Sequence, residues 1–468
     1  MFYILERKIM KYFSTRNRKI NFNFEEIFQR GLAPDGGLFL PYIIKKFNKT
    51  HLKKLKKFSY VDLTTEIVSN FCEPEFNKNK LKALIKKSYK KFKKKEVVSL
   101  VDVGEHKLLE LYHGPTLAFK DIAMQCIGNM YEELNVKEDR TTNIVVATSG
   151  DTGAAAISAL SNRKNINLFV LHPHNKISKI QRKIMTTIGG RNIYNIAVKG
   201  SFDDCQNIVK EMFADDIFRQ AINMSGVNSI NWARIIFQIV YYFYSYLKLE
   251  SKKVNYIVPT GNFGDIYAGY VAKKMGLPIE KLVVATNEND ILKRVINTGI
   301  YKPLKVRASL SPSMDIQVSS NFERLLFHVL NSDTKVKKMM TGLKINGYFK
   351  LDKKIIKKIK KDFLAFKTTN QETKKTIKEI YNKYQMFVDP HTATGFNSAT
   401  KFKNSYPKVI LGTAHPYKFL ETMKLATGKI LKKPSQLNQI SRSKEKFDIL
   451  DNNTNLIKKY ILDKQYEN

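Results

Sequence analysis

The chain has 468 residues, too many for one simple core, and this length predicts two or three domains. Its hydrophobic content of 43% is ample for a packed protein, and no apolar run approaches the roughly 20 residues that span a bilayer. The formal charge is +39, from 81 Lys and Arg against 42 Asp and Glu, so a nucleic-acid or anionic-membrane partner has to be considered.

The basic residues are spread along the whole chain. Two runs, KSYKKFKKKE (87–96) and KKIIKKIKKDF (353–363), have amphipathic helical spacing and predict solvated helix faces. We therefore expect no nucleic-acid partner and no membrane partner. The three cysteines are far apart and form no CxxC pair, which argues for a reducing compartment and against disulfides or a zinc site.

The first sixteen residues are too short and too charged for a secretory signal, so we expect a cytoplasmic protein. A short amphipathic organelle-targeting segment is the alternative.

The predicted elements change in character near residue 105. Residues 1–104 form an N-terminal subdomain with a turn-rich segment, GLAPDGGLFLP (31–41), followed by basic helical patterns. Strands, glycine turns and helices then alternate, which predicts parallel sheets covered on both faces. We expect an α/β fold with two lobes, 105–240 and 241–468, and a cleft between them. The individual predictions are a strand, turn and helix over 143–160, a strand over 166–173, a strand, glycine loop and helix over 254–276, and a strand over 282–287.

Two glycine turns follow predicted strands and open predicted helices. In PTGNFGD (259–265), converging backbone N–H groups and the helix N-terminus could bind a phosphate. The loop has neither the lysine of a P-loop nor the GxGxxG pattern, so it would hold one cofactor phosphate. In ATSGDTGAA (147–155), Ser149, Thr152 and the backbone amides could bind a carboxylate. A structural turn and an ordinary capped helix are the alternatives.

Lys120 stands among small and apolar neighbours in HGPTLAFKDIAMQ (113–125), where burial is expected. Burial lowers a lysine's preference for its charged form, so that the amine can bond to an aldehyde and carry protons. A solvated surface lysine is the alternative. Pyridoxal phosphate is a cofactor that needs a lysine and a phosphate loop in the same protein.

These motifs, in this order, resemble those of the threonine synthase family, fold-type-II enzymes that use pyridoxal phosphate. The resemblance covers nearly the whole chain and implies that the cofactor lies in the cleft between two parallel-sheet lobes. If the family start is matched, Met10 is the initiator and residues 1–9 are an extension. The matching segments are MKYFSTR (10–16), GLAPDGGLFLP, HGPTLAFKD (113–121), TSGDTGAA (148–155), GSFDDCQNIVK (200–210), NSINWAR (228–234), PTGNFGD, SMDIQVSSNFERLLF (313–327) and LGTAHPYKF (411–419).

The resemblance implies a lyase that converts O-phospho-L-homoserine and water to L-threonine and phosphate, in threonine biosynthesis. Lys120 would bind the cofactor aldehyde and move the Cα proton. Thr413 would hydrogen-bond the pyridine nitrogen, where a neutral hydroxyl limits the electron withdrawal of the ring. The cofactor phosphate would be surrounded by Gly261, Asn262, Phe263, Gly264 and Asp265.

The substrate brings its own phosphate and carboxylate. For the phosphate we expect Arg234 with Ser229 and Asn231, and Lys176; a surface ion pair is the alternative for Arg234. For the carboxylate we expect Ser149, Thr152 and the backbone N–H of Asp151. His113 and His415 flank motifs and are expected to be structural. No metal is expected, and the chain is expected to be a monomer or a small homo-oligomer.

Two other functions stay open. One is a different fold-type-II lyase, such as a threonine or serine dehydratase or a phospholyase acting on a related phosphoamine. The other is a nucleic-acid-binding protein with vestigial enzyme motifs, although no aromatic-rich basic RNA motif is present.

Overall fold

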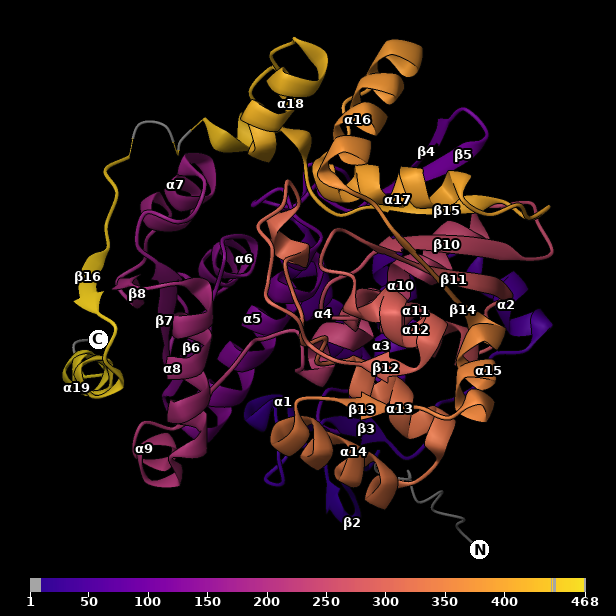
Figure 1. The fold of residues 1–468 in the computed structure, drawn as a ribbon. Coiled ribbons are helices and arrows are strands. Elements are labelled where there is room, and N and C mark those ends of the chain that lie inside the picture. Colours follow the sequence, from indigo (N-terminus) through magenta and orange to yellow (C-terminus); the bar gives the residue numbers. More distant parts are fainter. Residues whose placement is uncertain (1–9, 439, 441–442, 467–468) are drawn as a thin grey trace, which may run out of the picture.

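The computed structural model describes residues 10–438, 440 and 443–466. The choice between Met1 and Met10 as the start concerns residues 1–9, which lie outside the described residues. Two parallel sheets form the centres of two lobes that lie side by side (Figure 1). The α/β class that the sequence predicts is confirmed.

The larger lobe is built on a six-stranded sheet in which only β4 runs antiparallel to its neighbour. β15 lies in the middle of this sheet, and it pairs with β10 on one side and with β5 on the other. The strand order is β14 (Phe363–Lys367), β11 (Ile279–Thr286), β10 (Val254–Pro259), β15 (Lys408–Gly412), β5 (His106–Glu110) and β4 (Ser99–Val103).

The smaller lobe is built on a five-stranded, wholly parallel sheet. Its central strand covers Ile166–Pro173, as predicted, and all of that strand is buried, as expected of a strand covered on both faces. The strand order is β16 (Asp448–Asp451), β8 (Ile193–Lys199), β7 (Ile166–Pro173), β6 (Thr142–Ala147) and β9 (Met224–Ser225).

Two smaller sheets belong to the larger lobe. The N-terminal antiparallel sheet has the order β2 (Asn17–Phe22), β1 (Tyr12–Ser14), β3 (Phe39–Pro41), and β12 (Ile300–Tyr301) pairs with β13 (Phe349–Lys350). The order of the chain does not follow the division into lobes. β5 precedes the smaller lobe in the chain but lies in the six-stranded sheet, and β16 follows the larger lobe but lies in the five-stranded sheet. The division of the chain at residues 104 and 240 stays a prediction.

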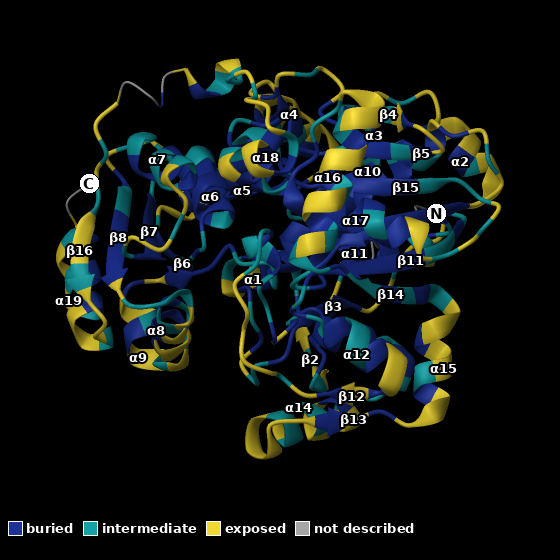
Figure 2. Ribbon diagram, turned by 45° about the horizontal axis from the view of Figure 1, so that its top comes forward, coloured by how far each residue is buried: buried dark blue, intermediate teal, exposed yellow. Residues whose placement is uncertain are grey.

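The helices surround the sheets, with buried faces toward the strands and exposed faces outward (Figure 2). Before the smaller lobe come α1 (Phe24–Arg30), α2 (Lys49–Leu55), α3 (Tyr60–Cys72) and α4 (Lys78–Tyr89). The smaller lobe and the return from it contain α5 (Lys120–Glu138), α6 (Asp151–Leu160), α7 (Lys179–Thr187), α8 (Phe202–Ala214), α9 (Asp216–Ala221) and α10 (Trp232–Leu247). The remainder contains α11 (Gly264–Lys274), α12 (Ile291–Thr298), η1 (Pro312–Met314), α13 (Phe322–Leu330), α14 (Asp333–Asn346), α15 (Lys353–Asp362), α16 (Asn370–Tyr384), α17 (Pro390–Thr400), η2 (Pro416–Phe419), α18 (Leu420–Thr427), η3 (Ser435–Leu437) and α19 (Thr454–Lys464).

The structure confirms one of the two predicted basic helices and only the beginning of the other. Lys353–Asp362 is helical, but the helix that begins at Lys78 ends at Tyr89, so most of the run 87–96 is turn. The physical reason is packing: buried Phe92 donates its N–H to the carbonyl of Tyr89 at 3.1 Å, and the chain then turns toward β4. Among the described residues, no helix has the length and apolar character that crossing a membrane requires.

Candidate functional site

Lys120 is the first residue of α5, and backbone hydrogen bonds join the segment before it to the segment that follows β15. Phe119 donates its backbone N–H to the carbonyl of Thr413 at 2.9 Å, and His415 donates to the carbonyl of Leu117 at 3.0 Å. Ala118 and Ala414 form the bridge between these two bonds. Lys120 therefore lies at the carboxyl end of the central strand of the larger sheet, where parallel sheets place ligands.

The expected burial of Lys120 is confirmed, since its side chain is 12% exposed. Its Nζ lies 3.5 Å from Oδ2 of Asp151 and 5.0 Å from the ring centre of Phe119. Burial lowers the pKa of Lys120; the Asp151 carboxylate opposes this shift, and the positive charges of Lys418 and Arg234 add to it. The site therefore favours a neutral amine more than water does.

Asp121 fixes the loop that leads to Lys120. Its carboxylate accepts hydrogen bonds from the N–H of Thr116 at 2.8 Å and from the hydroxyl of Thr116 at 2.6 Å. A Cβ at Gly114 would lie 2.5 Å from the Asp121 side chain, so the loop requires glycine there. Burial raises the pKa of Asp121 to about 6, and the bonds from Thr116 limit that rise.

The loop 259–265 joins β10 to α11 and has open backbone amides from residue 261 onward. Within the described part of the chain, none of the N–H groups of residues 261 to 266 donates a hydrogen bond to the protein. Phe263 has a φ of 63°, a left-handed conformation that is costly for a large side chain. Its ring packs against Phe322 and Phe363, with centroids 5.4 and 5.5 Å away, and this packing holds the loop.

Asp265 lies in the first turn of α11. Oδ1 accepts from Tyr241 at 2.5 Å and from Tyr242 at 2.8 Å, whereas the buried Oδ2 has no partner among the described residues. Burial raises the pKa of Asp265 to about 6, while the two tyrosines and the charge of Lys120 pull it down. Asp265 and Lys120 are therefore electrostatic neighbours across the site.

The turn 148–153 offers a second set of free amides. The hydroxyl oxygen of Thr148 accepts from the N–H groups of Gly150 and Gly153, each at 2.9 Å. In the described part of the chain, Ser149 and Thr152 have no protein partner for their N–H groups or their hydroxyls. The N–H of Asp151 has none either. This pattern suits a carboxylate at a helix N-terminus.

The side chain of Asp151 has contacts that the sequence did not indicate. One oxygen accepts from Lys418 Nζ and, at 3.1 Å, from Gln181; the other lies near Lys120 and accepts from the Ser313 hydroxyl at 3.3 Å. Burial alone would raise the pKa of Asp151, but the charges of Lys418 and Lys120 outweigh it and hold the pKa well below its usual range. Lys418 stands in the motif LGTAHPYKF, so the sequence held the signal that would have found it.

Arg234 is buried, and the expected alternative of a surface ion pair is wrong. Among the described residues, its guanidinium donates one hydrogen bond, from Nη1 to the carbonyl of Val227 at 3.1 Å, and Nε has no partner. Burial lowers the pKa of Arg234 to about 10. A buried guanidinium without a carboxylate partner is costly unless an anion binds there.

The other predicted phosphate ligands lie in less direct positions. The Asn231 side chain caps α10 and donates to the carbonyls of Phe28 and Gly226, at 2.9 and 3.2 Å. The Ser229 carbonyl accepts from Asn321 at 3.2 Å. Lys176 is exposed, and its charge acts on Asp204 at the start of α8.

The two histidines next to the motifs have structural contacts, as expected. His113 Nε2 lies 3.0 Å from Glu110 and 2.9 Å from the Ser99 hydroxyl. His415 Nδ1 accepts from the N–H of Tyr417 at 3.1 Å and so caps η2.

The residues present fit pyridoxal phosphate. Lys120 offers an amine for its aldehyde, and the free amides of residues 261 to 266 offer donors for its phosphate. The hydroxyl of buried Thr413 has no partner among the described residues, so it is available to the pyridine nitrogen. Lys120, Lys418 and Arg234 bring positive charge to this site, where Asp151 is the carboxylate in contact with both lysines. A phosphate group would compensate that charge.

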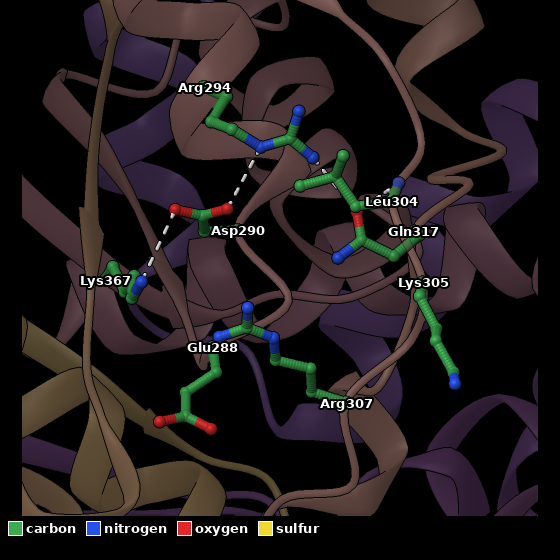
Figure 3. A pocket seen from close by; sticks show the side chains of 8 residues that line it. All are labelled: Glu288, Asp290, Arg294, Leu304, Lys305, Arg307, Gln317 and Lys367. Carbon is green, nitrogen blue, oxygen red and sulfur yellow. Dashed lines mark hydrogen bonds and ion pairs between the residues drawn. The ribbon is translucent and has the colours of Figure 1, made fainter. Parts of the chain in front are cut away.

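A separate cavity of about 430 Å³ lies beyond the carboxyl ends of β11 and β14 (Figure 3). Arg294 donates to Asp290 at 3.0 Å and to Gln317 at 3.0 Å, which holds one wall in place. This cavity contains neither a buried lysine nor the glycine loop, so it is not the cofactor site. Its lining residues are Glu288, Asp290, Arg294, Leu304, Lys305, Arg307, Gln317 and Lys367.

Comparisons with known proteins agree with this geometry. Three family models match the chain: threonine synthase N terminus over residues 11–89, pyridoxal-phosphate dependent enzyme over 107–411, and threonine synthase, C-terminal, over 392–461. The threonine synthase of Pseudomonas aeruginosa is 40% identical over 97% of this chain and 98% of its own length. That of Saccharomyces cerevisiae is 42% identical over 92% of each chain.

Solved structures give the same result. The pyridoxal-phosphate-bound threonine synthase of Brucella melitensis superposes with a TM-score of 0.94 at 42% identity, covering 98% of this chain and 100% of that one. The Escherichia coli threonine synthase gives a TM-score of 0.84 at 29% identity, covering 97% and 100%. Threonine deaminase isoform 2 of Solanum lycopersicum gives 0.53 at 12% identity over 85% of this chain and 96% of that one, a likeness of fold alone.

Proposed function

The chain belongs to the threonine synthase family of pyridoxal-phosphate-dependent enzymes, and we propose from that membership how its own residues convert O-phospho-L-homoserine and water to L-threonine and phosphate. The observation that carries the assignment of roles is the convergence of three kinds of group. A buried amine at Lys120, free amides at 261–266 and a free hydroxyl at Thr413 match the three ends of the cofactor.

Pyridoxal phosphate, when bound, supplies an aldehyde that joins an amine and a conjugated ring that stabilises negative charge on the neighbouring carbon. Gly261, Asn262, Phe263, Gly264 and Asp265 hold its phosphate through the loop amides, and Thr413 holds the ring nitrogen. Lys120 Nζ takes the proton from Cα of the substrate and later returns a proton there. Burial lowers the pKa of Lys120, which favours the neutral amine that can accept this proton.

The substrate carboxylate binds at the turn 148–153. Ser149 and Thr152 offer N–H and hydroxyl donors, and Asp151 offers its N–H. These donors orient the amino acid so that its Cα proton faces Lys120. The side chain of Asp151 does not bind the substrate carboxylate, since it lies against Lys120 Nζ.

The substrate phosphate binds at Arg234, whose buried guanidinium has no carboxylate partner in the part of the chain that the structure describes. Asn231 supports Arg234 by capping α10, and Ser229 and Lys176 stay predicted contacts. The overall reaction breaks the Cγ–O bond to phosphate and forms a Cβ–O bond with water.

The test is a product assay on the purified, cofactor-loaded protein given O-phospho-L-homoserine, with Lys120→Ala as the control. We expect threonine and phosphate in equal amounts, and neither from the control. Phosphate together with a keto acid and ammonia would instead identify an eliminating lyase. Activity on threonine without activity on phosphohomoserine would identify a dehydratase.

Three expectations stay predictions: a cytoplasmic location, a monomer or small homo-oligomer, and the absence of a nucleic-acid partner.

A further inference from the structure

Lys418 is a second buried lysine beside Lys120, and the roles proposed above do not use it. Its side chain is 0% exposed. Nζ donates to Oδ1 of Asp151 and, at 3.2 Å, to the carbonyl of Thr116. Because the other oxygen of Asp151 faces Lys120, one carboxylate lies between two lysines.

The backbone that positions Lys120 also positions Lys418. Lys418 belongs to η2, which begins at Pro416, three residues after Thr413, and is capped by His415. His415 is in turn bonded to Leu117, three residues before Lys120. The spacing between the two lysines is therefore set by the paired segments 117–119 and 413–415.

Both oxygens of the Asp151 carboxylate accept hydrogen bonds from side chains other than the lysines. Gln181 and Ser313 donate to it, and the N–H of Ser313 lies 3.3 Å from His391 Nε2, whose other ring nitrogen lies 2.7 Å from Asp389. The charged or titratable groups that interact electrostatically with the two lysines or with this carboxylate are Asp121, Arg234, Asp265, His391 and His415.

The two lysines differ in whether their bonding and protonation change during the proposed reaction. Lys120 changes its bonding and its proton during each turnover, whereas Lys418 stays bonded to Thr116 and Asp151. With Lys120 alone, Asp151 would lose its positive neighbour whenever Lys120 became neutral, and a buried, unpaired carboxylate is costly. Lys418 removes that cost.

We propose, on the basis of the function proposed above, that Lys418 is a positioning residue that keeps Asp151 ionised beside Lys120 at every stage of the reaction. Asp151 then accepts a hydrogen bond from Lys120 whether Lys120 is an amine or an ammonium. The positive charge of Lys418 also opposes protonation of Lys120. Substituting Lys418 and substituting Asp151 should therefore change the basicity of Lys120 in opposite directions.

The test measures the reactivity of Lys120 in the cofactor-free protein. Carbamylation by cyanate, a small reagent for neutral amines, is followed over pH by mass spectrometry of the peptide that contains Lys120. In Lys418→Met we expect the half-point to move up by about one pH unit or more, because a repelling charge is lost. In Asp151→Asn we expect it to move down, because the attracting charge is lost.

The opposite signs separate this proposal from simple loosening. Loosening would expose Lys120 in both variants and raise both half-points toward that of an ordinary lysine. An unchanged half-point in Lys418→Met, or a raised one in Asp151→Asn, overturns the proposal. Lys418→Gln is the second neutral variant and should reproduce the upward shift if Lys418→Met does not fold.

Lys408→Met is the matched control. Lys408 Nζ donates to the carbonyls of Ala399 and Phe402, at 2.8 and 2.9 Å, and this substitution should leave the half-point of Lys120 unchanged. The measurement uses no substrate, so it can fail while the product assay succeeds. Failure of the product assay in the unmodified protein would instead count against the proposed function.

Discussion

Phe119 and Thr413 are joined by a backbone hydrogen bond of 2.9 Å, so the residue before the candidate cofactor lysine is fixed to the residue proposed to contact the cofactor ring. The bond uses main-chain atoms only. Substitution of the Thr413 side chain should therefore leave Lys120 in place.

We expect Thr413→Val to keep the cofactor bound and to lower kcat about tenfold, which is the value of one lost hydrogen bond of roughly 1.4 kcal/mol. Thr413→Ser keeps the hydroxyl and should stay within about threefold of the parent. Steady-state kinetics together with the absorbance of bound cofactor measure both effects. Equal kcat values for the valine and serine variants would rule out the ring contact.

Gly261→Ala should weaken cofactor binding. The added Cβ would lie 2.9 Å from Ile316 Cδ1 and 3.1 Å from both Met314 Cα and the Ser313 carbonyl oxygen. Such overpacking costs about 1–3 kcal/mol, so we expect the cofactor Kd to rise about tenfold or more. Fluorescence titration of the cofactor-free protein gives the Kd.

Gly342→Ala is the matched control for that substitution. Gly342 lies inside α14, and a Cβ there meets nothing within 4 Å. Alanine should raise the free energy of unfolding by up to about 1 kcal/mol and leave the cofactor Kd unchanged. A comparable loss of cofactor affinity in both variants would show that the effect of Gly261→Ala is not local.

Arg234→Met should separate stability from function. The cofactor-free protein should be as stable as the parent or more stable by about 1 kcal/mol, because a buried charge without an anion is removed. The KM for phosphohomoserine should rise at least about tenfold, since the substrate phosphate loses its cation. Denaturant unfolding and kinetics measure the two effects.

Arg324→Met provides the comparison. Arg324 is equally buried, and burial likewise lowers its pKa to about 10, but it donates to Asn321 and to the carbonyls of Phe39 and Ile230. Its loss should lower the free energy of unfolding by about 3 kcal/mol or more. If Arg234→Met destabilised the protein as much, Arg234 would be a structural residue.

Asp265 should contribute to the pH dependence of the free energy of unfolding. Its pKa is raised to about 6 in the folded state, from 3.8, so the folded chain binds more protons than the unfolded chain between those pH values. The free energy of unfolding of the cofactor-free protein should therefore fall by about 3 kcal/mol as pH rises through this window.

Asp265→Asn should remove that part of the slope and keep both bonds from Tyr241 and Tyr242 to Oδ1. Chemical denaturation at pH 4 and pH 7.5 gives the slope. Parallel slopes in parent and variant would mean that Asp265 ionises normally. Asp121, with its pKa also raised to about 6, should contribute a slope of the same sign in both proteins.

Local patterns predicted much of the fold. The strand at 166–173 is found where expected, and the strand, loop and helix predicted over 254–276 are found with the helix ending at Lys274, because apolar runs, glycines and caps act over short distances. Strand pairing between distant residues has no such local signal. Neither the return of β16 to β8 nor the place of β15 between β10 and β5 could be predicted.

The candidate site divides in the same way. The burial of Lys120 and the open amides of the loop after β10 follow from motifs that the sequence displays. The contact between Asp151 and Lys418 joins residues that are 267 positions apart, and only the fold brings them together. Arg234 was identified by residue type, but its burial without an anion required the structure.

The position of β15 governs when the site can exist during synthesis of the chain. Until residues 408–412 have left the ribosome, β10 and β5 have no strand between them, and the two halves of the larger sheet are unjoined. Lys120 is made early, but its partner segment 413–415 comes some three hundred residues later. A nascent chain can fold its smaller lobe first, yet a competent cofactor site arises only when translation is nearly finished.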